Sequence, residues 1–460
     1  MVADGSGYDI VILGGGSGGY ACALRAAELG KRVALIEKDK VGGTCLHRGC
    51  IPTKALLHAA EVADLARESA SFGVRATLEG IDMPGVNAYK DKVVTRLWKG
   101  LQGLIESRHI DVIAGDGRLV SPTQVTVGGT LVEGAHVVLA TGSEARSLPG
   151  LAIDGERVIT SDQALTLDRV PSSVVILGGG VIGVEFASVW RSFGAEVTIV
   201  EMLPHLLPPE EESSSRLLER AFRRRGIAQR LGARFEGVKD TGSGVTVTLE
   251  GGATIDAELL LVAVGRGPVS AGLGYEEAGV ATERGYVIVD GYCQTSVPTI
   301  SAVGDLTPGL QLAHVGFAEG IMVAERLGGL SVTPIDYDGV PRVTYSDPEV
   351  ASVGLTSAIA AQRGIETTEF TYDLAGNGKS QILRTQGAAK VIATAGGGPV
   401  LGVHLVGARV GELIAEAQLI YNWEALPSEV AQLIHPHPTQ SEAIGEAHLA
   451  LAGKPLHVHS

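Results

Sequence analysis

Two stretches of this chain repeat the same order of apolar, glycine and polar positions. Residues 8–38 (YDIVILGGGSGGYACALRAAELGKRVALIEK) and 172–202 (SSVVILGGGVIGVEFASVWRSFGAEVTIVEM) align without a gap, at an offset of 164 residues. Each begins with a continuous apolar run, passes through clustered glycines and a longer run, and ends in a second apolar run followed by an acid. That order predicts a strand, a tight turn, a helix and a second strand, which is the start of a βαβ unit.

The hydrophobic pattern also predicts the elements outside the repeats. Residues 51–71 and 86–108 are expected to be helices, and Pro52 suits the first position of the earlier one. Residues 117–140 alternate between apolar and polar side chains and carry turn signals, so we expect a small antiparallel meander. Further strands are expected at 258–266 (ELLLVAVGR) and in TISAVGD, with a helix near 312–328.

The pattern changes over about the last 120 residues. There the segments RVTYSDPEVASVGLT and KVIATAGGGPVLGVHLVG read as antiparallel strands flanked by helices. The chain is therefore predicted to be an α/β protein with two Rossmann-like dinucleotide-binding domains and a C-terminal α+β domain. The expected boundaries are 1–150 and 151–268 for the two dinucleotide-binding domains, 269–338 for a central segment and 339–460 for the C-terminal domain.

Composition narrows the class of protein. A chain of 460 residues is too long for a single hydrophobic core. The formal net charge is −15 and there is no basic run, so we expect no nucleic-acid partner. No apolar stretch reaches the roughly 18 residues of a membrane span. The N-terminus, MVADGSGYDIVIL, shows no secretory or transit pattern, so we expect a cytoplasmic protein with no membrane contact.

The glycines of both repeats fit a dinucleotide fingerprint. They are Gly14, Gly16 and Gly19 in the first copy and Gly178, Gly180 and Gly183 in the second. Glycine at these positions lets the backbone approach a pyrophosphate, which binds at the helix N-terminus. Glu37 and Glu201, at the ends of the second strands, are expected to accept hydrogen bonds from ribose hydroxyls. A carboxylate repels a 2′-phosphate, so Glu201 favours NAD over NADP; its alternative role is a solvated acid.

Two cysteines stand close together in the string GGTCLHRGCIPTK. Cys45 and Cys50 have four residues between them and can close a small ring, but so short a loop stabilises a fold only weakly. The chain has 4 cysteines in all, too few for a disulfide framework or a zinc site. The pair is therefore predicted to be redox-active, and no metal is expected. Cys22, in the first fingerprint helix, and Cys293, in a late strand, are expected to be small buried side chains.

Further polar positions are candidates for chemistry. Lys54 follows Cys50 by four residues, so the two share a helix face, and a cation there favours a thiolate. The alternative is that Lys54 is an exposed helix lysine with no role in the chemistry. The prolines of HPHPT extend the backbone, so at most one of His435 and His437 is expected to enter a site. Glu442 either orients a histidine or completes a capping box that begins three residues earlier.

The cysteine string, the doubled fingerprint and the C-terminal string HPHPTQSE together resemble the flavin disulfide reductases over essentially the whole chain. The order of the motifs is also that of the family. The resemblance implies an FAD-binding domain at 1–150 that residues 269–338 complete, an NAD-binding domain at 151–268 and a dimerisation domain at 339–460. Within the family, GCIPTK and HPHPT are similar to the enzymes that act on lipoamide.

The resemblance also implies a role for each candidate residue. Cys45 would react with the substrate, and Cys50 would lie against the flavin. Asp305 would meet the ribityl chain of FAD, and His437 would act as the base that Glu442 orients. Lys54 would lie beside the flavin and pair with Glu185, and glycines at strand ends, Gly142, Gly265 and Gly304, would line the cofactor sites together with the fingerprint residues.

The implied activity is the oxidation of dihydrolipoamide to lipoamide, with electrons passing through Cys45 and Cys50 and through FAD to NAD⁺. The implied partners are a lipoyl group on an acyltransferase subunit of a 2-oxoacid dehydrogenase complex, and a second copy of the chain that shares the active site. Two alternatives stay open. The chain could reduce another small disulfide, or it could act mainly as a docked component of a complex.

Overall fold

The computed structural model describes residues 7–458. They form two compact units, each made of three segments. The first contains the chain up to Ala55, Pro84–Arg146 and Gly265–Ile335; the second contains Leu56–Met83, Ser147–Val264 and the chain from Asp336 onward. The expected domain boundaries remain predictions, and the outer ends of the first and last domains, residues 1–6 and 459–460, lie outside the described residues.

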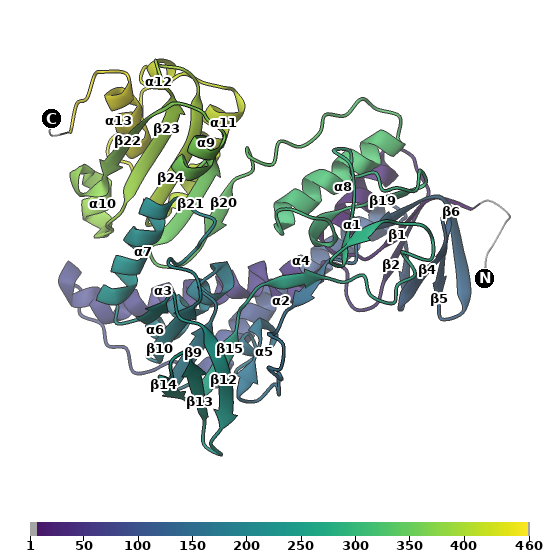
Figure 1. Ribbon diagram of the computed structural model, residues 1–460, viewed down its shortest axis with the longest axis horizontal. Coiled ribbons are helices and arrows are strands. Elements are labelled where there is room, and N and C mark those ends of the chain that lie inside the picture. The colour runs from purple at the N-terminus through teal and green to yellow at the C-terminus, as the bar shows by residue number, and fades with distance from the viewer. Residues whose placement is uncertain (1–6, 459–460) are drawn as a thin grey trace. The chain divides into compact units, whose positions relative to one another are not determined.

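The first unit is built on a seven-stranded sheet in the order β3-β2-β1-β6-β5-β4, with β19 paired to β6 (Figure 1). The strands are β1 (Tyr8–Leu13), β2 (Val33–Glu37), β3 (Asp111–Ala114), β4 (Gly117–Ser121), β5 (Gln124–Val127), β6 (Thr130–Leu139) and β19 (Ile300–Ala302). Strands β3, β2, β1, β6 and β19 pair in parallel, whereas β4, β5 and β6 form the antiparallel meander predicted for 117–140. Ile10, Val11 and Ile12 are fully buried, as expected of a parallel strand covered on both faces.

Helix α1 (Ser17–Glu28) packs closely against α8 (Ala313–Leu327), the helix predicted near 312–328. Glycines make the close approach possible, because a Cβ on Gly320 would lie 2.3 Å from the carbonyl oxygen of Gly18. The core cluster that includes α1 and α8 contains Cys22 and Cys293. Both thiols are therefore buried, as the sequence predicted.

The expectation that Cys293 lies in a strand was wrong. Its φ of 59° is left-handed, and it lies in a turn before β19. The Asp290 carboxylate holds this turn by accepting from the amides of Tyr292 and Gln294, each at 2.9 Å. Such a local side-chain bond gives the backbone an alternative to a strand ladder.

The two helices between the repeats are present with shifted ends. α3 (Cys50–Glu68) continues into the 3₁₀ turn η1 (Ser69–Phe72), and α4 (Met83–Ser107) begins three residues before the predicted start. Pro52 is the third residue of α3 rather than the first, still within the turn where a missing amide costs no hydrogen bond. Among the described residues, no helix is long and apolar enough to cross a membrane.

The second unit contains the sheet of the second repeat, in the order β11-β10-β9-β15-β8, with all strands parallel. Its elements are β8 (Val158–Ile159), β9 (Ser173–Leu177), α6 (Val181–Phe193), β10 (Glu196–Glu201), α7 (Glu212–Arg224), β11 (Ala228–Leu231) and β15 (Leu259–Val262). An antiparallel meander of β12 (Phe235–Asp240), β13 (Val245–Leu249) and β14 (Thr254–Ala257) precedes β15.

The C-terminal part of the second unit is a five-stranded antiparallel sheet in the order β20-β21-β24-β23-β22. Its elements are β20 (Arg342–Thr344), β21 (Glu349–Gly354), β22 (Thr367–Asp373), β23 (Ala388–Thr394), β24 (Val400–Gly407), α11 (Val410–Asn422) and α13 (Glu442–Leu451). The remaining elements of the chain are α2 (Gly43–Arg48), β7 (Ser143–Ala145), α5 (Ser161–Ala164), β16 (Arg266–Pro268), β17 (Thr282–Glu283), β18 (Tyr286–Val287), η2 (Gly304–Leu306), α9 (Ser357–Gln362), η3 (Leu374–Gly376), α10 (Gly378–Leu383) and α12 (Pro427–Val430).

A buried ionic cluster joins the segment after β10 to this C-terminal sheet. The ammonium of Lys390 on β23 lies 2.9 Å from a carboxylate oxygen of Glu211 and 2.8 Å from one of Glu369. It also donates to the Ser357 hydroxyl at 2.7 Å, and the Ser357 amide donates to Glu211 at 2.9 Å. Every charge in the cluster thus has an opposite partner or a hydrogen-bond donor, which is the condition for burying it.

Candidate active site

The two cysteines of the redox string lie on consecutive helices. Cys45 is in α2, Cys50 begins α3, and Gly49 is the residue between the helices. A Cβ on Gly49 would lie 3.0 Å from the carbonyl oxygen of Thr44 and 3.2 Å from the Cα of Cys45, so a side chain there would have little room. The side chains of Cys45 and Cys50 are both half-buried.

The environment of Cys45 favours its protonated form. A hydrogen bond with Cys50, together with burial and the nearby charge of Cys50, raises the pKa of the Cys45 thiol, while Lys54 opposes the shift. His47 and Arg48, which follow Cys45 in the same helix, each have a different partner. His47 Nε2 lies 3.0 Å from the Val41 carbonyl oxygen, and Arg48 forms an ion pair with Asp39.

The first glycine turn is close-packed where the fingerprint predicts it. A Cβ on Gly14 would lie 2.2 Å from the Ala140 carbonyl oxygen, and one on Gly19 would lie 1.9 Å from that of Gly14. Glu37 closes the turn, because its carboxylate accepts from the Gly15 amide at 2.7 Å and from the Asp39 amide at 2.8 Å. The sequence did not predict these amide bonds. Each carboxylate oxygen has a second lone pair with which to accept from a ribose hydroxyl.

The second turn repeats these contacts, and its glycines, its acid and the two amides that bond the acid lie 164 positions after their counterparts. A Cβ on Gly178 would lie 2.4 Å from the Ala263 carbonyl oxygen, and one on Gly183 would lie 2.0 Å from that of Gly178. Glu201 accepts from the Gly179 amide at 2.6 Å and from the Leu203 amide at 2.7 Å. The repeat therefore extends from the sequence to individual hydrogen bonds.

The middle glycine of each turn faces open space, which suits a bound pyrophosphate. A Cβ on Gly16 would meet only the Cα of Gly43, at 4.0 Å, and one on Gly180 would meet no atom within 4 Å. Each is the N-cap residue of its helix, α1 or α6, and no side chain caps either helix. Both turns can thus present backbone amides and the positive end of a helix to an anion, so the residues fit FAD and NAD.

Asp305 is held by residues that the sequence analysis did not select. Its carboxylate accepts from the Ser143 hydroxyl at 2.5 Å. The guanidinium of Arg266 donates to the same hydroxyl at 2.8 Å and to the Ser143 carbonyl oxygen at 2.6 Å, and it reaches the Thr44 hydroxyl at 3.4 Å. The strands that carry Ser143 and Arg266, β7 and β16, pair with each other. Asp305 is thereby linked to the residue before Cys45.

The other predicted cofactor glycines all adopt left-handed backbone angles. φ is 69° at Gly142, 107° at Gly265 and 74° at Gly304. A Cβ on any of the three would meet no atom within 4 Å, so conformation rather than crowding requires glycine there. The amide of Gly304 donates to the buried carboxylate of Glu319 at 2.6 Å, a supporting contact that the sequence analysis also missed.

Tyr20 is a further residue near the thiols that the sequence analysis missed. Burial, together with the charges of Cys45 and Cys50, raises the pKa of its phenol to about 12. Lys54 lies four residues after Cys50 on α3, as predicted. Glu185 is buried on α6, where its carboxylate accepts from the Tyr345 amide at 2.9 Å. Lys54 and Glu185 belong to different compact units, and their pairing remains a prediction.

Glu442 makes both of the contacts that the sequence offered as alternatives. One carboxylate oxygen lies 2.9 Å from His437 Nδ1, and the other accepts from the Thr439 amide at 2.8 Å. Helix α13 begins at Glu442 itself, so the capping contact precedes the helix by three residues. His435 points to a different partner, with its Nε2 2.7 Å from Glu416. His435 is mostly buried, whereas the His437 side chain is 78% exposed and available to a second molecule.

Comparison with known proteins agrees with this geometry. Residues 8–320 match the model of the pyridine nucleotide-disulphide oxidoreductases, which use FAD and NAD(P), and residues 340–448 match the dimerisation domain of the same family. The dihydrolipoyl dehydrogenase of Bacillus subtilis is 42% identical, covering 98% of this chain and 99% of that protein.

Two solved structures have the same fold. LpdA from Mycobacterium tuberculosis is 29% identical with a TM-score of 0.90, covering 96% of this chain and 99% of its own. The HOCl-induced flavoprotein disulfide reductase RclA from Escherichia coli is 30% identical with a TM-score of 0.87, covering 96% of this chain and 99% of its own. These matches confirm the fold class and the resemblance inferred from the sequence. The chain belongs to the pyridine nucleotide-disulphide oxidoreductase family.

Proposed function

We propose that this protein is a dihydrolipoyl dehydrogenase, which oxidises dihydrolipoamide to lipoamide and reduces NAD⁺. The observation that carries the proposal is the end-to-end similarity to the Bacillus subtilis dihydrolipoyl dehydrogenase, at 42% identity. The carboxylate of Glu201, held at the end of β10 by two amides, supports NAD rather than NADP as the electron acceptor.

Cys45 and Cys50 carry the thiol chemistry. A thiolate of dihydrolipoamide attacks the sulfur of Cys45 in the oxidised pair, and the bond to Cys50 breaks, so that Cys50 leaves as a thiolate. The second substrate thiol then displaces Cys45 and closes the lipoamide ring. The pair has gained two electrons, and the raised pKa of Cys45 supports its role as the partner that keeps a proton.

When bound, FAD would supply a two-electron acceptor between the thiols and NAD⁺. The chain positions it. The amides at the start of α1 would hold the pyrophosphate, and Asp305, whose carboxylate Ser143 fixes, would bind the ribityl chain. Lys54 would supply a cation on the helix face of Cys50.

His437 acts as the base that deprotonates the substrate thiol, and Glu442 sets its orientation. With Nδ1 directed at the carboxylate, Nε2 is left to take the proton. We infer that His437 enters the site of a second copy of the chain. The family match to a dimerisation domain supports this, as do large apolar side chains exposed within the matched residues 340–448, such as Trp423 at 76% and Ile434 at 98%.

The natural substrate is then a lipoyl group carried on an acyltransferase subunit of a 2-oxoacid dehydrogenase complex. A cytoplasmic location fits a chain with few cysteines and one reactive pair. Co-purification of the protein with acyltransferase and decarboxylase subunits, from the soluble fraction of its own cells, tests both points. Recovery with the membrane fraction, or without such subunits, contradicts them.

The function itself is tested by comparing substrates. The purified yellow protein is assayed with NADH and with NADPH against lipoamide, oxidised glutathione and mercuric ion. We expect NADH-dependent reduction of lipoamide to be the fastest reaction. NADPH-dependent reduction of glutathione without lipoamide activity overturns the proposal. The likeness to RclA favours one alternative, a reductase of another disulfide, and this assay separates it by the absence of lipoamide turnover.

A subunit-mixing experiment tests the shared site. Inactive Cys45→Ser and His437→Ala proteins are unfolded together and refolded. If each site takes its histidine from the other copy, heterodimers contain one intact site and activity returns. Mixed dimers that form, as shown by mass spectrometry, but remain inactive refute the sharing.

A further inference from the structure

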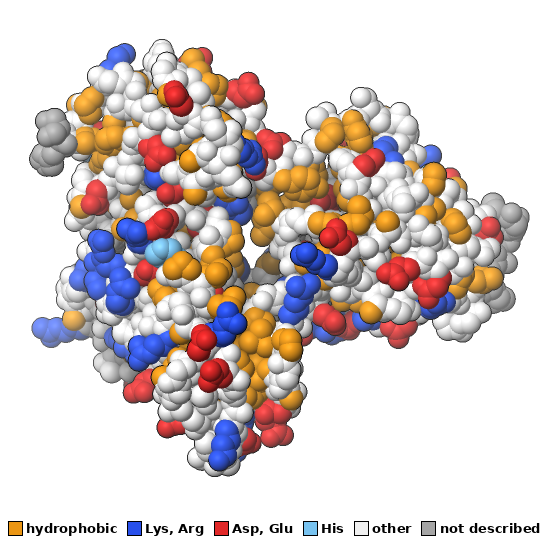
Figure 2. All heavy atoms as spheres, viewed as in Figure 1, with side chains coloured by type: hydrophobic (Ala, Val, Ile, Leu, Met, Phe, Trp, Pro, Cys, Tyr) orange, Lys and Arg blue, Asp and Glu red, His pale blue; other side chains and the backbone are white. Residues whose placement is uncertain are grey.

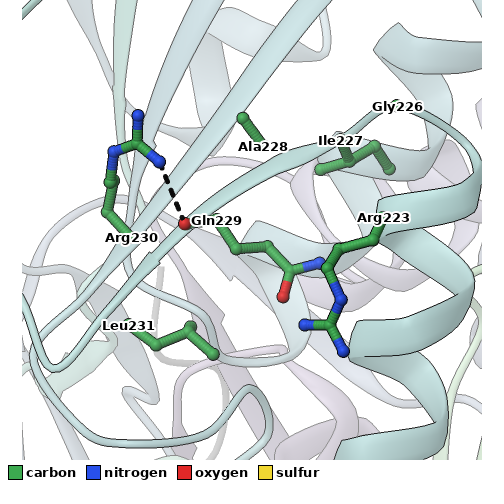
Figure 3. Close-up of a pocket in the computed structure, with 7 residues that line it drawn as sticks. All are labelled: Arg223, Gly226, Ile227, Ala228, Gln229, Arg230 and Leu231. Atoms are coloured by element: carbon green, nitrogen blue, oxygen red, sulfur yellow. Dashed lines mark hydrogen bonds between the residues drawn. The ribbon is translucent and has the colours of Figure 1, made fainter.

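A groove that the proposed reaction does not use runs along strand β11 of the second unit (Figure 3). Its volume is about 570 Å³, and it is lined by Arg223 at the end of α7 and by residues 226–231. All of the lining thus comes from one helix end, one turn and one strand. The floor includes the buried side chain of Ile227 and the half-buried side chain of Leu231.

Strand β11 is an edge of its sheet. Among the described residues it pairs with β10 on one side and with no strand on the other. An edge strand presents backbone donors and acceptors in the spacing that an added strand requires.

The groove is basic, in a chain whose net charge is −15. The expectation that the chain has no basic run was wrong, because Arg223, Arg224 and Arg225 are consecutive. Arg223 and Arg230 are exposed, and neither forms an ion pair with a carboxylate in the described part of the chain. The same holds for Arg220 and Arg224 on α7, over which Lys and Arg side chains gather in Figure 2. Arg230 donates to the Gln229 carbonyl oxygen, at 3.5 Å. Guanidinium groups without a carboxylate partner beside an open strand favour an anionic ligand.

Gln229 adds a second polar feature. Its amide nitrogen donates to the Glu219 carbonyl oxygen at 2.9 Å, which fixes the side chain. Its side-chain oxygen is buried and has no hydrogen-bond partner within residues 7–458. A buried acceptor without a donor is uncommon in folded proteins, and a ligand amide would satisfy it.

The two arginines that line the groove lie on opposite sides of the strand. Side chains alternate along β11, so Ala228 and Arg230 point to one side and Gln229 and Leu231 to the other. Figure 3 shows Arg223 on the side of Gln229. A strand added along this edge would also alternate, so carboxylates that meet both arginines would be an odd number of residues apart.

We propose that β11 is a docking site for an extended acidic segment of a partner protein, which binds by adding a strand to the sheet. Carboxylates of the segment pair with Arg223 and Arg230, and its backbone pairs with β11. The same positive charges repel the β11 edge of a second copy, so they select an acidic strand and discourage self-association. This site goes beyond the proposed oxidoreductase reaction and does not depend on it.

Fluorescence anisotropy of labelled octapeptides tests the proposal on the intact flavoprotein. The probe is Thr-Val-Glu-Glu-Val-Thr-Val-Thr, whose two glutamates are adjacent. We expect saturable binding that added salt weakens. We expect roughly tenfold weaker binding when both glutamates are replaced by glutamine, and when the protein carries Arg223→Gln and Arg230→Gln.

Two further probes separate strand addition from simple attraction of charge. The first is the same peptide with alternate backbone amides methylated, which keeps the charge and blocks pairing. The second is a single-stranded oligothymidylate of the same length. Both should bind at least roughly tenfold more weakly than the parent peptide. The proposal is overturned if wild-type protein does not bind the parent peptide, if the double variant binds it equally well, or if either control probe matches it. Unchanged flavin content and lipoamide activity show that the double variant is folded.

Discussion

Replacing Lys390 by methionine tests the buried ionic cluster that joins the segment after β10 to the C-terminal sheet. The side chain of Lys390 is 12% exposed and that of its partner Glu211 is 7% exposed, so their charges are largely removed from water. Methionine keeps much of the volume of lysine but removes the cation. Glu211 would then be a buried carboxylate that keeps only its bonds with Ser357.

Losing one partner of a buried pair costs about 3–5 kcal/mol, because the remaining charge is left uncompensated. We therefore expect Lys390→Met to lower the free energy of unfolding by about 3 kcal/mol. With a denaturant slope of about 3 kcal/mol per molar, the urea midpoint of the second unit falls by roughly 1 M. The double variant with Glu211→Gln should lose less than the sum of the two single variants, since it removes both charges.

A matched control is the exposed pair of Arg363 and Asp338, whose nitrogen and oxygen atoms approach to 2.6 Å while the side chains are 48% and 37% exposed. Arg363→Met should cost less than about 1 kcal/mol, because water screens that pair. If Lys390→Met costs no more than Arg363→Met, burial does not strengthen the cluster and the reasoning is refuted.

The pH dependence of stability gives a second measure of the same cluster. Burial raises the pKa of Glu211, but hydrogen bonds from Lys390 and the Ser357 amide outweigh it and hold the pKa below its usual 4.5. The contribution of Glu211 to folding stability is complete above pH 4.5 and declines as pH falls through the folded-state pKa. Burial lowers the pKa of Lys390, but Glu369 and Glu211 outweigh it and hold the pKa above 10.5, so the lysine contribution is lost as pH rises past that value. Lys390→Met should make the free energy of unfolding depend less on pH in both the acidic and the alkaline range.

Three further predictions concern the candidate site and helix α13. Gly19→Ala places a Cβ 1.9 Å from the Gly14 carbonyl oxygen and should release FAD, whereas Gly183→Ala places one 2.0 Å from the Gly178 carbonyl oxygen and should raise the KM for NAD⁺ with flavin retained. The flavin-to-protein absorbance ratio and the KM for NAD⁺ are measured for both variants. Equal loss of flavin from both contradicts the assignment of the turns. Glu442→Gln should lower kcat/KM by roughly 10–100-fold and shift the pH profile of kcat/KM, because His437 loses the carboxylate that orients the imidazole. An unchanged pH profile would assign Glu442 to capping alone. Burial lowers the pKa of His448 to about 4, so the contribution of His448 to stability is present above pH 6.5 and is lost toward pH 4. His448→Leu should therefore flatten the fall in thermal midpoint between these pH values. If the midpoint falls equally in both proteins, the fall is due to other groups.

The repeats, the glycine turns and most of the elements were predictable because their signals are local. Apolar runs, glycines and acids that stand within some 30 residues of one another determine a strand, a turn and the amides around it. Glu442 shows the limit of local reasoning, since the sequence offered two roles as alternatives and the two oxygens of one carboxylate make both contacts.

The contacts that the sequence did not reveal join residues far apart in the chain. Arg266 and Ser143 are separated by 123 positions, and Lys390 and Glu211 by 179. No periodicity links such residues, because their proximity depends on how strands assemble. The prediction of a strand at Cys293 was wrong because of a local contact. The carboxylate of Asp290 bends the backbone where the apolar pattern suggested a strand.

The matching hydrogen bonds of Glu37 and Glu201 have a consequence for how such a chain could arise and change. Duplication of one ancestral turn would supply the binding sites for both electron-transfer cofactors, so that a second phosphate-binding site would not have to evolve separately. Because the two turns hold their acids in the same way, neither can tell a flavin from a nicotinamide. That distinction has to be made by what surrounds each turn, such as the Ser143–Asp305 contact in the first unit. Evolution of cofactor choice in this chain would therefore proceed through the surroundings while the turns stay fixed.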